Sequence, residues 1–162
     1  MISLDITSVT NEIFALTALR KIADPDESTP EPLCRDQLPA LRVLIRSAFA
    51  RVAVSLAPYL DSSACDPADT PAAKPYDPRE QLQLEFDFGD REKTLTSGSL
   101  LTLKRYLEHL LALHVLSDVY SPLESPSAAS ARAAESATLL TRIHTLLTLP
   151  SPTPLLIHPS RY

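Results

Sequence analysis

The placement of proline is the feature of this sequence that most restricts its fold. The chain has fifteen prolines and only two glycines in 162 residues. The prolines gather at 25–39, 58–78 and 150–159, with two more at 122 and 126. Because proline removes a backbone donor and clashes with the preceding turn, it is excluded from helix interiors but tolerated in the first turn. Helices can therefore form only between these clusters. The scarcity of glycine excludes glycine-rich phosphate loops and dinucleotide-binding fingerprints.

Four proline-poor stretches carry apolar residues every three or four positions, which is the spacing of a helix with a buried face. We predict helices over about 8–23, 36–57, 99–120 and 126–149. Asp36 and Ser125 are the expected N-caps of the second and fourth helices. The third helix is apolar nearly all round, which places it at the centre of the domain or at a self-association surface.

Each of these helices has an expected buried seam. The seams are Val9, Ile13, Leu16 and Ala23; Leu38, Leu41, Ile45, Ala48, Val52, Leu56 and Tyr59; Leu100, Leu103, Leu107, Leu110, His114 and Ser117; and Ala129, Ala133, Ser136, Leu140, Ile143 and Leu147.

Strict alternation of polar and apolar residues over 81–88 predicts a strand. One face of this strand would carry Leu82, Leu84, Phe86 and Phe88. Residues 2–6 alternate in the same way, and 155–157 could supply a third strand. Strands this far apart cannot form a tight hairpin, so they would pair only once the helices bring them together and cover their apolar face.

These patterns predict a mainly α protein. We expect a four-helix, up-down-like bundle with a small element of two or three strands formed by 2–6, 81–88 and 155–157. The length suits a single domain over 1–162, with a proline-rich internal linker at 61–80 and a C-terminal tail at 150–162. The apolar share of 44% and the charged share of 22% are those of a globular chain.

Composition also excludes several protein classes. No apolar run approaches the roughly eighteen residues of a membrane span, and residues 1–5 lack the features of a signal peptide. Cys34 and Cys65 cannot build a disulfide framework. We therefore expect a cytoplasmic protein that does not contact membranes, with both cysteines reduced. A net charge of −5 argues against nucleic-acid binding, which depends on many contacts between basic residues and phosphates.

Motif searches predict no catalytic residue, metal site or cofactor. The Glu-x-x-His pairs of di-iron bundles are absent, because Glu108 directly precedes His109, residue 111 is leucine and no glutamate stands three positions before His144. His109 and His114 lie five positions apart and point to different faces, so the i, i+4 zinc arrangement fails as well. The two cysteines form no Cys-x-x-Cys pair, and no Gly-x-Ser-x-Gly elbow is present.

His114 is the one histidine on an apolar seam. It could act as a buried base or a pH-sensitive contact, or it could be a core histidine bonded to Ser117 or to a backbone carbonyl. Together with His144, it would line a pocket between the third and fourth helices. Such a pocket is the basis of an alternative function, a small-molecule-binding or enzymatic bundle.

Arg35, Arg42 and Arg46 fall within about 40° of one another on a helical projection. The stretch between Asp36 and Asp61 contains no acidic residue. These arginines would be either a solvated face or a contact stripe for an acidic partner, a phosphate or another copy of the chain.

The predicted strand is a second candidate contact. Leu82, Leu84, Phe86 and Phe88 could simply cover the helices, or the strand's edge could accept a strand from a second chain. The leading hypothesis is therefore a non-enzymatic interaction or assembly protein that binds a protein partner or itself. A component of a bacteriophage or mobile-element particle would be one example.

Overall fold

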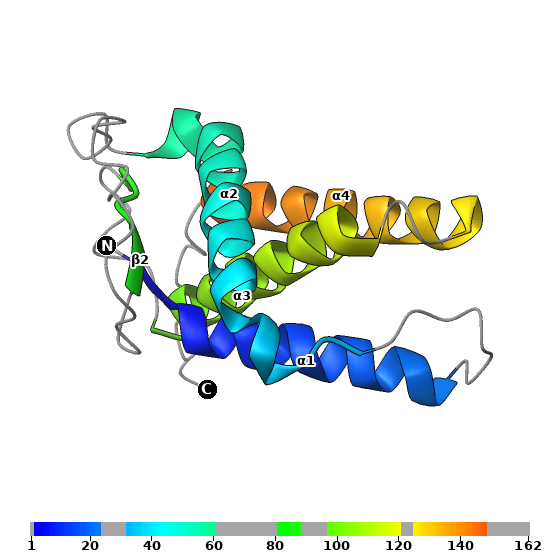
Figure 1. The fold of residues 1–162 in the computed structure, drawn as a ribbon. Coiled ribbons are helices and arrows are strands. Elements are labelled where there is room, and N and C mark those ends of the chain that lie inside the picture. The colour runs from blue at the N-terminus through cyan, green and yellow to red at the C-terminus, as the bar shows by residue number, and fades with distance from the viewer. Residues whose placement is uncertain (1, 24–31, 61–80, 89–96, 121–124, 149–162) are drawn as a thin grey trace, which may run out of the picture.

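The computed structural model describes residues 2–23, 32–60, 81–88, 97–120 and 125–148 (Figure 1). Their order is β1 (Ile2–Asp5), α1 (Ile6–Ala23), the 3₁₀ turn η1 (Arg35–Gln37), α2 (Leu38–Leu56), the 3₁₀ turn η2 (Ala57–Tyr59), β2 (Gln81–Leu84), α3 (Ser97–Tyr120) and α4 (Pro126–Thr148).

The predicted fold class, mainly α with a small β element, is confirmed: four helices accompany one two-stranded sheet in the part of the chain that the structure describes. The linker at 61–80, the tail at 150–162 and the third strand at 155–157 lie outside the described residues.

The predicted central position of α3 is also confirmed. It packs against α1, α2, α4 and β1. In Figure 1, α1 and α4 flank α3 on opposite sides, α4 runs opposite to α3, and α2 crosses them. Because three helices and a strand cover α3, burial extends around it from Leu103 to Tyr120. The predicted seam on α3 is wrong at its end, where Ser117 is exposed and His114 only half-buried.

Side-chain caps decide where two of the helices begin. α1 starts at Ile6, earlier than predicted, because the backbone N–H of Thr7 donates to Asp5 Oδ1 at 2.9 Å. Ser125 caps α4 as predicted, since its Oγ accepts from the Ala128 N–H at 3.4 Å. The prediction for Asp36 is wrong: it lies inside η1, and α2 begins at Leu38.

Replacing Asp5 with alanine should lower the free energy of unfolding by about 1 kcal/mol, because it removes the acceptor for an N–H at the start of α1. Urea denaturation of the Asp5→Ala and Asp5→Asn variants measures this. Asparagine is also a good cap, so Asp5→Asn should retain most of the stability. Equal losses in the two variants would contradict a capping role.

The two strands pair although they lie far apart in the sequence. Antiparallel pairing places Ile2 opposite Leu84 and Leu4 opposite Leu82, so these four apolar side chains share the face turned to the core. A single bridge from Leu60 to Phe86 continues the pairing. The predicted pairing of the N-terminal and middle strands is thus present, although regular strand geometry ends at Leu84.

The buried faces of α1 and α4 differ from the predicted seams. On α4, Ile143 and Leu147 are buried as predicted. Ala133 of the predicted seam is exposed, however, and Leu139, which lies outside it, is buried. On α1, the buried face includes two threonines that an apolar pattern omits. Thr10 donates to the Ile6 carbonyl at 2.7 Å and Thr17 to the Phe14 carbonyl at 3.0 Å, so these hydroxyls are buried with their hydrogen bonds satisfied.

Candidate functional site

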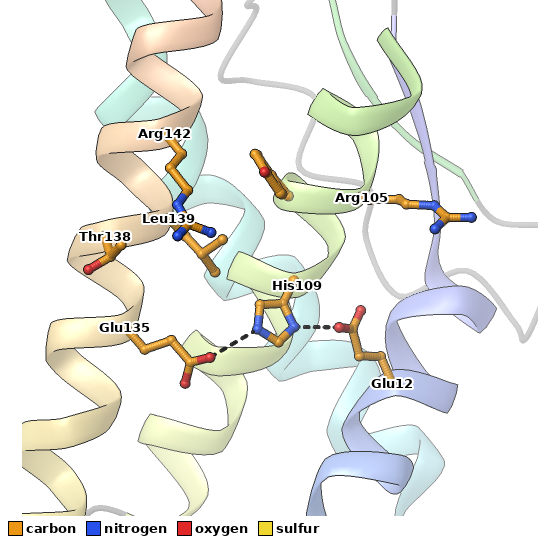
Figure 2. A pocket seen from close by; sticks show the side chains of 8 residues that line it. Glu12, Arg105, His109, Glu135, Thr138, Leu139 and Arg142 are labelled. Atoms are coloured by element: carbon orange, nitrogen blue, oxygen red, sulfur yellow. Dashed lines mark hydrogen bonds and ion pairs between the residues drawn. The ribbon is translucent and has the colours of Figure 1, made fainter. Parts of the chain in front are cut away.

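His109 joins three helices through two glutamates (Figure 2). It lies on α3, and its ring Nδ1 is paired with the carboxylate of Glu12 on α1. Its Nε2 lies 3.4 Å from Glu135 Oε1 on α4. The His109 side chain is 25% exposed, and those of Glu12 and Glu135 are 31% and 56% exposed. The cluster therefore lies at the edge of the core, where water reaches one side of it.

The geometry favours the protonated form of His109. A neutral imidazole has only one N–H, whereas the imidazolium can donate from both ring nitrogens to two carboxylates. The hydrogen bond to Glu12 is the main cause that raises the pKa of His109 above its ordinary value. Partial burial opposes this rise, while the charge of Glu12 and the contact with Glu135 add to it. With both nitrogens donating, the ring keeps no lone pair for a metal ion.

A pocket of about 480 Å³ opens beside this cluster. No α2 residue lines it. Its walls are Glu12, Arg105, Tyr106, His109, Glu135, Thr138, Leu139 and Arg142. In Figure 2 the guanidinium of Arg142 extends over Leu139 toward His109, while Arg105 projects from the other side of α3.

His114 and His144 do not meet at one site. α3 and α4 run in opposite directions, with His109 opposite Glu135. His144 is nine residues past Glu135, so it lies beside the first half of α3, on the other side of His109 from His114. With a helical rise of 1.5 Å per residue, the two histidines are roughly 20 Å apart. Neither lines the pocket beside His109.

His144 contacts η2, whereas His114 lies near enough to Arg51 of α2 to be affected by its charge. The ring of His144 lies edge-on to Tyr59 with centroids 5.2 Å apart, and its Nδ1 is 3.3 Å from the Tyr59 hydroxyl. Burial lowers the pKa of His114 below its ordinary value, and the charge of Arg51 adds to this, while Asp118 opposes it. Arg51 itself forms a two-pronged ion pair with Asp118 that joins α2 to α3.

The three predicted arginines divide between two elements. Arg35 is exposed in η1, whereas Arg42 and Arg46 are partly buried on α2 and both take part in contacts within the structure. On the predicted strand face, Leu84 and Phe86 are buried, and Leu82 and Phe88 are partly buried against the core.

A surface that the sequence analysis did not single out runs along the outer side of α2. Its members are spaced three or four residues apart, lie opposite the buried face and are all exposed. Val43 is 64% exposed and Val54 75%. We call it the outer stripe of α2; it consists of Ala40, Val43, Ser47, Ala50 and Val54. The signal was present in the sequence as a second, uncharged series of helical spacing.

The cluster of Glu12, His109 and Glu135 was missed because no local motif encodes it. The three residues are separated by 97 and 26 positions. Spacing rules examine residues a few positions apart, so they rejected His109 on its immediate neighbours alone. The one available signal was that Glu12 borders the predicted buried face of the first helix.

No family model, curated protein or solved structure matches this chain. Among the described helices, none is both long enough and apolar enough to cross a bilayer. The described residues also contain no group of histidine, cysteine or acidic side chains suited to hold a metal ion.

Proposed function

We propose that this protein is a non-enzymatic interaction module that binds an amphipathic helix of a partner protein along the outer stripe of α2. The observation that carries the proposal is the exposure of Val43 and Val54, at 64% and 75%, on an uncharged stripe of a helix whose opposite face is packed. An apolar stripe at helical spacing is the surface that helix-in-groove recognition uses.

The charge of α2 supports an acidic partner. From Leu38 to Leu56 the helix carries three arginines and no acidic residue. Arg42 and Arg46 lie on one side of the outer stripe and Arg51 on the other. Arg51 is already paired with Asp118, so the net positive charge lies along the border that carries Arg42 and Arg46. This charge attracts a helix with an acidic flank and speeds its encounter with α2.

The same charge disfavours pairing of α2 with α2 of a second copy. A symmetric dimer through the outer stripe would bring one set of arginines against the other, and like charges across an interface oppose association. The proposal is therefore a partner of opposite charge, with a monomeric protein in the absence of that partner.

A direct test measures fluorescence anisotropy with two labelled synthetic helices. Both carry leucine and alanine on one face; the flanks are glutamate in one and lysine in the other. We expect saturable binding of the glutamate peptide, weakening as salt is added, and at least about tenfold weaker binding of the lysine peptide. The double variant Val43→Ser/Val54→Ser should bind the glutamate peptide more weakly than the original protein by a similar factor.

The matched control is Leu19→Ser/Ile22→Ser on α1, which removes two side chains of comparable exposure, 61% and 75%, away from the outer stripe. It should bind the glutamate peptide like the original protein. Equal binding of the two peptides, or loss of binding only in the α1 variant, would reject the proposal. A stable dimer in light scattering that the α2 variant abolishes would assign the outer stripe to a second copy instead.

A further inference from the structure

The pocket beside His109 has an excess of positive charge once its internal pairs are counted. Glu12 and Glu135 are both engaged by the ring of His109. Arg105 and Arg142 also line the pocket, and within the part of the chain that the structure describes neither forms an ion pair or hydrogen bond. Counted over the whole lining, three cationic side chains face two carboxylates, which leaves a net charge of about +1 when His109 is protonated; Arg105 lies on the other side of α3 from Arg142 (Figure 2).

Arg142 is placed to hold a ligand. Figure 2 shows it extending from α4 over Leu139 toward the imidazole. A guanidinium offers a planar fork of N–H donors that matches two oxygens of a carboxylate or phosphate. The neighbouring lining is mixed: Leu139 and the ring of Tyr106 are apolar, while Thr138 carries a hydroxyl. Such a wall suits a ligand with one anionic group and an apolar body.

We propose that this pocket binds a small organic anion, a carboxylate or phosphate monoester, with its charged group on Arg142 and its apolar part against Leu139 and Tyr106. A volume of about 480 Å³ lies within the range of roughly 300–1,000 Å³ of small-molecule sites. The two glutamates do not repel such a ligand strongly, because each already faces the His109 cation. The inference is independent of partner binding at α2, since no α2 residue lines the pocket.

The ligand chemistry can be tested with three probes that share one ring: benzoate, phenyl phosphate and the uncharged benzamide. Titration followed by ¹H–¹⁵N NMR of the full chain reports which backbone amides move. We expect benzoate or phenyl phosphate, or both, to shift amides around His109 and Arg142. Benzamide should bind at least about tenfold more weakly, because it lacks the charge that pairs with Arg142. The better of the two anions identifies the preferred head group.

Substitutions distinguish specific binding in this pocket from non-specific attraction of anions to arginines elsewhere on the surface. Arg142→Ala should weaken binding of the preferred anion at least about tenfold, and Arg142→Lys should weaken it less, because lysine keeps the charge but loses the fork. The control is Arg35→Ala, which removes an exposed arginine of η1 that is not part of the pocket lining. Binding should be retained in this control.

The proposal fails if neither anion shifts amides near the pocket, or if benzamide binds as tightly as the anions. It also fails if Arg142→Ala and Arg35→Ala bind equally well. Should Arg142→Ala prove unfolded by its NMR spectrum, the comparison of Arg142→Lys with Arg35→Ala decides, because a lysine at this exposed helical position preserves both charge and helix propensity.

Discussion

Leu107→Ala should lower the free energy of unfolding by about 2–5 kcal/mol. Leu107 is 0% exposed on the central helix α3, and the helices and strand around it cannot all move inward to fill the space that its side chain leaves. The cost therefore combines the lost burial of apolar surface with the free energy of a cavity. Urea denaturation followed by circular dichroism measures the change.

Leu101→Ala is the matched control for Leu107→Ala. It makes the same substitution on the same helix, but Leu101 is 54% exposed. We expect its free energy of unfolding to change by no more than about 0.5 kcal/mol. Similar losses in the two variants would mean that α3 is not the centre of the core.

His109→Gln should change how stability depends on pH. The folded pKa of His109 is raised, chiefly by its hydrogen bond to Glu12, so the folded state binds a proton more tightly than the unfolded state. The resulting stabilisation is fully present below the unfolded pKa of about 6.5 and is lost as pH rises through the folded pKa. Near pH 6 the original protein should exceed the variant by about 1–2 kcal/mol, a value reduced for the partial exposure of the cluster.

The test measures the free energies of unfolding of the original protein and of His109→Gln near pH 6 and near pH 9, and compares the difference between the two proteins at each pH. The advantage of the original protein should shrink as pH rises through the folded pKa of His109, because the folded state then loses the proton as well. A difference that stays constant across this range would show that His109 stabilises the fold by packing alone, without its charge.

His114→Gln is the control for His109→Gln, because it should change the pH dependence of the free energy of unfolding in the opposite direction. Burial lowers the folded pKa of His114, so the unfolded state takes up the proton first. The original protein therefore loses stability as pH falls from about 6.5 through the lowered folded pKa, and this variant removes that loss. The two histidine variants should thus diverge from the original protein in opposite directions between neutral and mildly acidic pH.

Local patterns in the sequence were sufficient for the fold class. Proline positions and helical spacing located all four helices that the structure describes, and the Ser125–Pro126 start was correct because both signals are local. The N-cap at Asp36 failed because η1 takes up that residue instead. η1 is closed by the hydrogen bond from the Gln37 N–H to the Cys34 carbonyl, and the Gln37 side chain accepts from the Cys34 N–H in return. Boundaries depend on such single hydrogen bonds, which spacing alone does not reveal.

The candidate site could not be predicted in the same way. His109 meets Glu12 and Glu135 only after α1 and α4 dock on opposite sides of α3, and that docking depends on crossing angles and on the rotation of each helix. The pocket was expected beside His114 and His144, but the antiparallel register of α3 and α4 separates them. The apolar positions of α2 were recognised on its buried side, while the second series on its outer side was overlooked.

The pairing of β1 with β2 has a consequence for biosynthesis. Ile2 lies opposite Leu84, so β1 has no partner strand until the residues of β2, far along the sequence, have been made. In the folded protein Ile2 and Leu4 are only 6% and 0% exposed. Before β2 is available, their side chains remain in contact with water and can bind to other apolar surfaces. α3 and α4, by contrast, are neighbours in sequence and can dock as soon as both emerge. β1 therefore reaches its final place only after β2 has been made, and its apolar side chains stay accessible to a chaperone until then.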